Sequence, residues 1–326
     1  MGKTRIINRR EVEELLSMEY CVDAMAETLK QVSWKKTSMI QRGMLPAQAG
    51  NMFAVMQACN VGQSICGAKV IIFPGREARE RGTNQGIIPL FDTQTGRLEA
   101  IVDAECITAV RTAATSGAAT HVLARKDAHV LAILGAGRIG RLHVEAICGV
   151  RPVDRVLVWN RTAPRAEECC RWVREQFGIE AQAFLDAEEA VRQADIVCTV
   201  TGAKDPVLLG EWLKEGTHIN AVGACSAASR ELDTLAVAKS RVFADQMEAV
   251  LRDGGDVLIP VSHGELTKDH VVGEVGDVLI GRLEGRQNPS QITMFESVGI
   301  AVEDLAAANM VYQKALALGV GVEVEI

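Results

Sequence analysis

A glycine-rich turn between an apolar run and a helix-like segment limits the folds open to this chain. The stretch LAILGAGRIGRLH, residues 131–143, runs from four apolar residues into Gly135, Gly137 and Gly140. In a Gly-x-Gly-x-x-Gly motif the first glycine permits a tight turn and the second lets the backbone approach a pyrophosphate. The third lets the helix pack closely on the strand. Because a strand-like run precedes the motif and a helical pattern follows it, the segment predicts a dinucleotide-binding βαβ unit.

The chain beyond the motif continues to alternate between strand-like and helix-like segments. Short apolar runs rich in Val and Ile occupy 129–134, 155–160, 179–184, 195–201, 218–223 and 241–245. Helical patterns occupy 139–148, 164–177 and 187–193. Strands that alternate with helices form parallel sheets with helices on both faces. We therefore predict an α/β fold with a Rossmann doubly wound parallel sheet.

The segments before and after this region have another pattern. Strand-like runs at 67–73, 86–96 and 97–103 precede an Ala-rich helical stretch at 107–124. Near the end of the chain, 297–319 reads as one amphipathic helix, and we expect it to return to the N-terminal part. The expected domains are residues 1–122 together with 298–326, an α+β domain, and residues 123–297, the dinucleotide-binding domain.

Composition excludes several classes of function. A net charge of −7 over 326 residues and an aromatic content of 4% argue against a nucleic-acid partner, which would need a basic face or stacking platforms. No apolar run reaches the roughly 18 residues of a membrane span, and the first residues lack the pattern of a signal peptide. The 9 cysteines show no metal-ligand spacing. We expect reduced thiols, no metal site and a cytoplasmic location.

The end of the second strand indicates which dinucleotide binds. Sites for NAD usually carry Asp or Glu there, which accepts from the ribose hydroxyls. This chain has Asn160, Arg161 and Thr162 instead. An arginine can pair with a 2′-phosphate, and the polar neighbours can donate hydrogen bonds to it. The triplet favours NADP(H), while NAD(H) remains possible and Arg161 could instead be a solvated surface residue.

Three cations in the N-terminal part are candidates for substrate binding. Lys69 lies inside the apolar run GAKVII, where a lysine costs free energy unless it has a partner or a function. Arg111 lies among small residues in AVRTAAT, and Arg42 precedes GMLPAQ. Converging cations suit a substrate carboxylate. For each residue alone, surface exposure or a structural ion pair is the alternative.

The combination resembles a known family. GAKVIIFPG, RGTNQGIIPLFDTQTGRLEAIVD, LGAGRIG, INAVGA, RELD and FESVGIAVEDLAAA, in this order, resemble the ornithine cyclodeaminase/mu-crystallin family over nearly the whole chain. The resemblance implies a homodimer, with a substrate-binding and dimerisation domain completed by the C-terminal helix. It also implies that Arg42, Lys69 and Arg111 contact the substrate carboxylate and the reacting nitrogen, with Val298 nearby. Positions implied to contact the cofactor are Thr83, Gly135, Gly137, Arg138, Ile139, Gly140, Asn160, Arg161, Thr162, Thr201, Val222 and Ser297.

Two departures from the family pattern bear on the reaction. Cyclodeaminases of this family resemble one another in carrying Asp just after INAVG, and this chain has Cys225 there. They also tend to carry a Glu before the lysine segment, where this chain has Ala54. A thiol has a reference pKa of about 8.5, against about 3.9 for Asp, so it does not simply replace a carboxylate.

We therefore predict an enzyme that uses NAD(P)H to reduce the C=N bond of a cyclic ketimine or α-imino acid. The reverse reaction is amino-acid dehydrogenation. Arg42 and Arg111 would hold the carboxylate, Lys69 would lie at the reacting nitrogen, and the nicotinamide would supply the hydride. One alternative is ornithine cyclodeamination with recycled NAD. The other is a non-catalytic protein that binds a small ligand.

Overall fold

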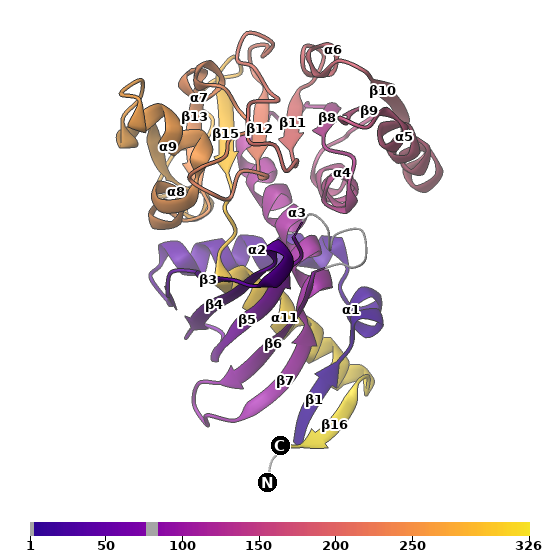
Figure 1. The fold of residues 1–326 in the computed structure, drawn as a ribbon, viewed down its shortest axis with the longest axis vertical. Coiled ribbons are helices and arrows are strands. Elements are labelled where there is room, and N and C mark those ends of the chain that lie inside the picture. Colours follow the sequence, from indigo (N-terminus) through magenta and orange to yellow (C-terminus); the bar gives the residue numbers. More distant parts are fainter. Residues whose placement is uncertain (1–2, 76–83) are drawn as a thin grey trace. The chain divides into compact units, whose positions relative to one another are not determined.

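The chain folds into two units that contain different kinds of sheet. The computed structural model describes residues 3–75 and 84–326. Unit 1 comprises Met1–Arg111 and Ile300–Ile326, and unit 2 comprises Thr112–Gly299 (Figure 1). The division falls inside helix α3 (Ala104–Leu123), earlier in the chain than the boundary expected after residue 122.

Unit 2 is built on a parallel sheet. Its strands are β8 (Val130–Leu134), β9 (Arg155–Trp159), β10 (Glu180–Phe184), β11 (Ile196–Thr199), β12 (His218–Ala221), β13 (Ser240–Ala244), β14 (Val271–Glu274) and β15 (Ile292–Glu296). Their order is β10-β9-β8-β11-β12-β15-β13-β14, and every pairing is parallel. Strands β8, β11, β12 and β15 are buried along their whole length, as expected for a sheet covered on both faces. The predicted doubly wound α/β fold is confirmed.

The helices of unit 2 connect these strands. They are α4 (Arg138–Val150), α5 (Ala163–Phe177), α6 (Ala187–Val191), α7 (Thr234–Lys239), α8 (Met247–Asp253), α9 (Gly255–Ser262) and α10 (Val275–Leu279). Strand order reverses at β8, because β9 and β10 lie to one side of it and β11 and β12 to the other. Ligands of open α/β sheets bind at such a reversal, beyond the carboxyl ends of the strands. The glycine loop, between β8 and α4, lies there.

Unit 1 is built on a mixed sheet. Its strands are β1 (Lys3–Ile7), β2 (Thr37–Met39), β3 (Gly43–Pro46), β4 (Met52–Asn60), β5 (Ile65–Phe73), β6 (Gln85–Asp92), β7 (Leu98–Asp103) and β16 (Val322–Glu325). The order is β16-β1-β7-β6-β5-β4-β2, with β3 beside β4. Only the pairing of β1 with β7 is parallel among these described strands.

One face of this sheet is covered by helices of the same unit. Besides α1 (Arg9–Leu15), the unit contains α2 (Met18–Ser33) and α11 (Ala301–Leu318). Helix α11 contacts β4, β5 and β6 as well as α2. Alternate side chains of the central strands, such as Ala54, Lys69 and Leu90, are buried on this face. The intervening ones, such as Phe53 and Ile87, remain exposed although they are apolar.

Some elements were not expected from the sequence. Strand β15 enters the parallel sheet between β12 and β13, and β16 pairs with β1 although the two strands lie at opposite ends of the sequence.

Within the described ranges, no helix has the length and apolar character that a bilayer crossing requires.

Two glycines of α4 give a direct test of the close packing at the glycine loop. A Cβ at Gly140 would lie 2.0 Å from the backbone O of Gly135, whereas a Cβ at Gly149 would meet nothing within 4 Å. We expect Gly140→Ala to lower the free energy of unfolding by about 1–3 kcal/mol. Gly149→Ala, the matched control, should raise it by about 0.5–1 kcal/mol because alanine favours the helix. Urea unfolding measures both, and equal effects would contradict the packing described.

Candidate functional site

The glycine loop is held to the end of β9 by an amide side chain. Gly135 has φ +118°, a conformation that favours glycine, and its N–H donates to the Trp159 carbonyl at 2.9 Å. Asn160 Oδ1 accepts from the N–H of Ala136 at 3.1 Å, and its Nδ2 donates to the Thr162 carbonyl at 3.0 Å. The structure therefore gives Asn160 a role that sequence reasoning missed, because it positions the loop.

The first turn of α4 is anchored by a buried histidine. His143 Nδ1 lies 2.8 Å from the Ile139 carbonyl, and Nε2 lies 2.9 Å from Ser116 Oγ. Because a carbonyl only accepts, Nδ1 carries the proton and Nε2 accepts from the Ser116 hydroxyl. Burial lowers the pKa of His143 to about 4, so the ring is neutral. The residues after the glycine loop are thus fixed by neutral hydrogen bonds.

A cationic cavity of about 430 Å³ adjoins the loop. It is lined by Ala136, Gly137, Arg138, Arg141, Leu142, Arg165, Glu168 and Trp172. The guanidinium of Arg141 lies 5.7 Å from the centroid of the Trp172 ring. Nearby in the chain, Arg161 is exposed and forms no hydrogen bond or ion pair with any described residue. The sequence motif identified Arg138 and Arg161, but Arg141 and Trp172 join the site only through helix packing.

Three more residues predicted to contact the cofactor, and Val298, predicted to lie near the substrate, follow strands of unit 2. Thr201 follows β11, and its N–H and hydroxyl donate to Glu231 Oε1 at 2.6 and 2.5 Å. Val222 follows β12 and is half-buried. Ser297 and Val298 follow β15 and are buried. Thr83 lies outside the described residues.

Unit 1 contains a cluster of four buried charges. Lys69 on β5 is 1% exposed, and its Nζ lies 2.8 Å from Asp304 Oδ2 on α11. Arg111 on α3 donates from Nε to Asp304 Oδ1 and from Nη1 to Glu303 Oε2, both at 2.8 Å. Two cations and two carboxylates therefore compensate one another in an interior that would exclude any of them alone.

These contacts set the protonation of the cluster. Burial lowers the pKa of Lys69 to about 8; Asp304 opposes this shift, while Arg111 and Arg42 add to it. Burial favours the neutral acid at Asp304, but Arg111 and Lys69 hold the pKa of that carboxyl below its usual range. Lys69 can therefore exchange a proton near neutral pH.

The three cations predicted to bind the substrate lie in different surroundings in unit 1. Lys69 and Arg111 come together, and Arg42, half-buried near the end of β2, lies close enough to influence the pKa of Lys69. Sequence reasoning missed Glu303 and Asp304, although adjacent acids in the apolar stretch AVEDLAAA could have signalled buried partners. Two residues stand where cyclodeaminases of the family carry acids. Of these, Ala54 is buried in β4, and Cys225 in unit 2 is exposed.

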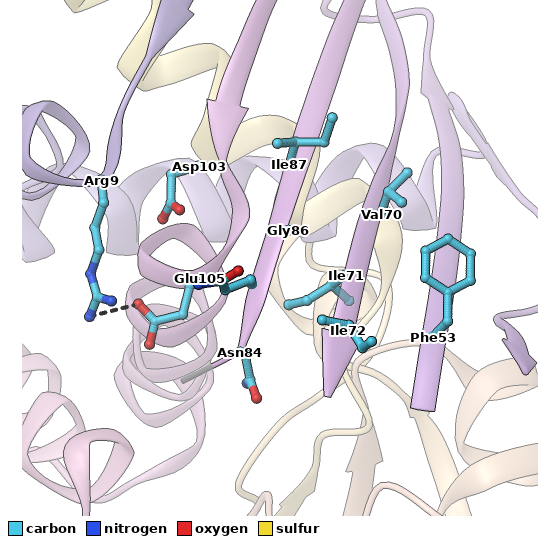
Figure 2. Close-up of a pocket in the computed structure, with 11 residues that line it drawn as sticks. Arg9, Phe53, Val70, Ile71, Ile72, Asn84, Gly86, Ile87, Asp103 and Glu105 are labelled. Carbon is cyan, nitrogen blue, oxygen red and sulfur yellow. Dashed lines mark ion pairs between the residues drawn. The ribbon is translucent and has the colours of Figure 1, made fainter. Parts of the chain in front are cut away.

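A second cavity, of about 640 Å³, lies on the other face of the mixed sheet (Figure 2). Phe53, Val70, Ile72 and Ile87 give it an apolar wall, and Arg9 pairs with Glu105 at its edge, 3.1 Å apart. Val70 follows Lys69 in β5, so the two side chains point to opposite faces. This cavity is separate from the charged cluster. Among the described residues, no group of three or more His, Cys, Asp or Glu could hold a metal ion.

Comparison with known proteins identifies the family of this chain and several similar proteins. The sequence model of the ornithine cyclodeaminase/mu-crystallin family matches residues 3–319. The Δ1-pyrroline-2-carboxylate reductase of Bacillus cereus is 36% identical over 98% of this chain and 99% of its own length.

Two solved structures are similar over their whole length. The Thermococcus litoralis Δ1-pyrroline-2-carboxylate reductase, in complex with NADH and L-proline, is 32% identical with a TM-score of 0.95, over 98% of this chain and 100% of its own. An archaeal alanine dehydrogenase dimer with bound NAD is 30% identical with a TM-score of 0.94, and the match covers 100% of both chains.

The charged cluster of unit 1 can be tested by neutralising its central carboxylate. Asp304→Asn would leave Lys69 and Arg111 buried with a single compensating acid. We expect the free energy of unfolding to fall by roughly 3–5 kcal/mol. Asp154→Asn, at an exposed position, is the matched control and should change little. Denaturant unfolding at neutral pH measures both, and wild-type stability in Asp304→Asn would show that the charges are not mutually dependent.

Proposed function

Because the chain belongs to the ornithine cyclodeaminase/mu-crystallin family, we propose that it is an NAD(P)H-dependent reductase of imino carboxylates. Its substrate is a cyclic ketimine or α-imino acid whose C=N bond is reduced, and the reverse reaction is amino-acid dehydrogenation. The observation that carries the proposal is the buried Lys69, whose ammonium is compensated by Asp304 and has a pKa of about 8. Relatives named as Δ1-pyrroline-2-carboxylate reductases support this substrate class.

The residues of unit 1 suggest how a substrate would be held. Arg42 and Arg111 would bind its carboxylate, since a guanidinium matches that geometry. Glu303 and Asp304 orient the guanidinium of Arg111. Lys69 would lie at the reacting nitrogen and keep it protonated, which makes the C=N carbon more electrophilic. Orientation of the substrate would contribute much of the rate.

The residues of unit 2 fit a dinucleotide. The glycine loop leaves space where a Cβ at Gly137 would meet nothing within 4 Å, and the N-terminus of α4 favours a pyrophosphate. Arg138, Ile139 and Gly140 would line the pyrophosphate, while Thr201, Val222 and Ser297 would line the nicotinamide side, with Val298 near the substrate. A nicotinamide supplies the hydride when it is bound.

The cofactor in this proposal is preferentially NADP(H), although relatives were solved with NADH or NAD. No carboxylate ends β9, and Arg161 is exposed beside Asn160 and Thr162. Arg165, at the first turn of α5, lines the cationic cavity. These charges favour a 2′-phosphate over a ribose hydroxyl.

Self-association would bring two copies together through the uncovered face of the mixed sheet. Phe53, Ile87 and Leu45 are 38%, 46% and 64% exposed there. A surface this apolar usually marks an interface. The archaeal alanine dehydrogenase, which is similar over its full length, is a dimer.

Activity is tested with NADPH and Δ1-pyrroline-2-carboxylate, by following loss of reduced cofactor. We expect turnover that declines as pH rises above about 8, because Lys69 then loses its proton. Lys69→Met should lower kcat/KM by about 10²–10⁴-fold. The proposal fails if a panel of imines gives no turnover while ornithine releases ammonia, or if the wild type binds ligands without turnover.

Cofactor choice is tested at the exposed Arg161 and Arg165. Arg161→Ala and Arg165→Ala should each raise KM for NADPH by about 10–150-fold, since a charged hydrogen bond contributes about 1.5–3 kcal/mol. KM for NADH should hardly change. Arg171→Ala, exposed on the same α5 helix, is the matched control. Equal losses with both cofactors would reject discrimination by a 2′-phosphate.

A further inference from the structure

Four buried carboxylates gather beyond the carboxyl ends of the strands of unit 2. They belong to Glu231, Asp245, Asp256 and Glu296. Glu231 accepts from the N–H groups of Thr201 and Gly223 at 2.6 and 2.7 Å. It thereby joins the segments that follow β11 and β12.

Two further carboxylates extend these connections. Asp256 Oδ1 accepts from the N–H groups of Glu231 and Leu232 at 2.8 and 2.7 Å. Asp245 Oδ2 accepts from the N–H groups of Val298 and Gly299 at 2.9 and 2.8 Å. The carboxylate cluster therefore holds the loops that carry Thr201, Val222 and Ser297.

Glu296 is the member without such bonds. It is 1% exposed, and its Oε2 has no hydrogen-bond partner among the described residues. Asp256 Oδ2 likewise has none, and neither side chain forms an ion pair within the described part of the chain. An unpaired carboxylate in such an interior takes up a proton rather than remain charged.

The surroundings of the pair are acidic. Asp256, Asp245, Glu231 and Cys225 lie close enough to Glu296 to act on it electrostatically, and Arg230 acts on Asp256 in the same way. Burial, followed by these neighbouring acids, raises the pKa of Glu296 well above its usual value. Burial is also the main cause that raises the pKa of Asp256 to about 7. Two buried acids without partners cannot both ionise at little cost, so the pair retains at least one proton.

The start of α9 packs closely against Glu296 and the loop at 226–229. A Cβ at Gly254 would lie 2.9 Å from Glu296 Oε1, and one at Gly255 would lie 1.9 Å from the Ser229 carbonyl. The two glycines before Asp256 thus allow α9 to approach both. Loss of the retained proton would place two repelling anions in this buried region.

We propose that the two buried acids Asp256 and Glu296 retain one proton and that this proton keeps the loops of Thr201, Val222 and Ser297 in the arrangement that binds the dinucleotide. The assignment of these loops to the cofactor rests on the proposed function. Glu296 is a positioning residue here, since it acts through Asp256 and Ser297. Loss of the proton at alkaline pH would lower the affinity for the cofactor.

The direction of the pH effect follows from the raised pKa values. Protonation stabilises the folded arrangement fully below the ordinary carboxyl range, and this stabilisation is lost as pH rises through the folded pKa values, from about 7 upward for Asp256. If one proton is linked to binding, affinity falls by up to about tenfold per pH unit above the folded pKa.

Direct binding of NADPH and NADH to the full chain, followed by fluorescence from about pH 6 to 10, tests the proposal without involving Lys69 chemistry. Wild type and Glu175→Gln, an exposed control on α5, should lose affinity as pH rises. Glu296→Gln should lose less affinity as pH rises, because its amide cannot ionise and only Asp256 of the two acids can still lose a proton. Should Glu296→Gln not fold, Asp256→Asn replaces it, since its amide oxygen can still accept from Leu232.

Three results overturn the proposal: flat wild-type affinity, an unchanged decline in the variant, or no protonated carboxyl band in the infrared spectrum at neutral pH. Such a band, weaker in Glu296→Gln, supports the retained proton. If wild type binds no dinucleotide at any pH, the proposed function fails, while the infrared band and the pH dependence of Tm still decide whether the proton exists.

Discussion

The ion pair between Lys69 and Asp304 is the constraint on which unit 1 depends. Lys69 belongs to β5 and Asp304 to α11, which follows unit 2 in the sequence. A buried ammonium is too costly without its partner, so the late helix must return to the early sheet. Arg111 joins the same carboxylate from α3. Packing, charge and the proposed substrate chemistry therefore depend on one set of contacts.

The two units keep their buried charges in different ways. In unit 1, carboxylates meet ammonium and guanidinium groups, so the charges are compensated and Lys69 retains a proton that it can exchange. In unit 2, buried carboxylates accept from backbone N–H groups, and no described cation pairs with Asp256 or Glu296. In our proposal, a retained proton takes the place of such a cation. Each unit therefore contains a group with a pKa near neutrality, Lys69 in unit 1 and Asp256 in unit 2. The stability of each unit should depend on pH through that group.

Local patterns made much of the fold predictable. The runs of unit 2 and the glycine loop carry their signals within a few residues, and the structure confirms the doubly wound sheet. Long-range partners were missed: Asp304 for Lys69, β15 between its neighbours, and Arg141 with Trp172 in the cationic cavity. Such contacts arise from packing between segments far apart in sequence. Asn160 shows the same limit, since its loop contacts have no sequence signature.

Hydride transfer to an imino carbon can be followed with an isotope label. NADPH carrying deuterium at both positions of the nicotinamide C4 would be incubated with the chain and Δ1-pyrroline-2-carboxylate, and the product examined by mass spectrometry and NMR. Hydride transfer predicts proline with one deuterium at C2 and one oxidised cofactor for each proline formed. Unlabelled proline, or proline formed from ornithine with no net oxidation of cofactor, would contradict it.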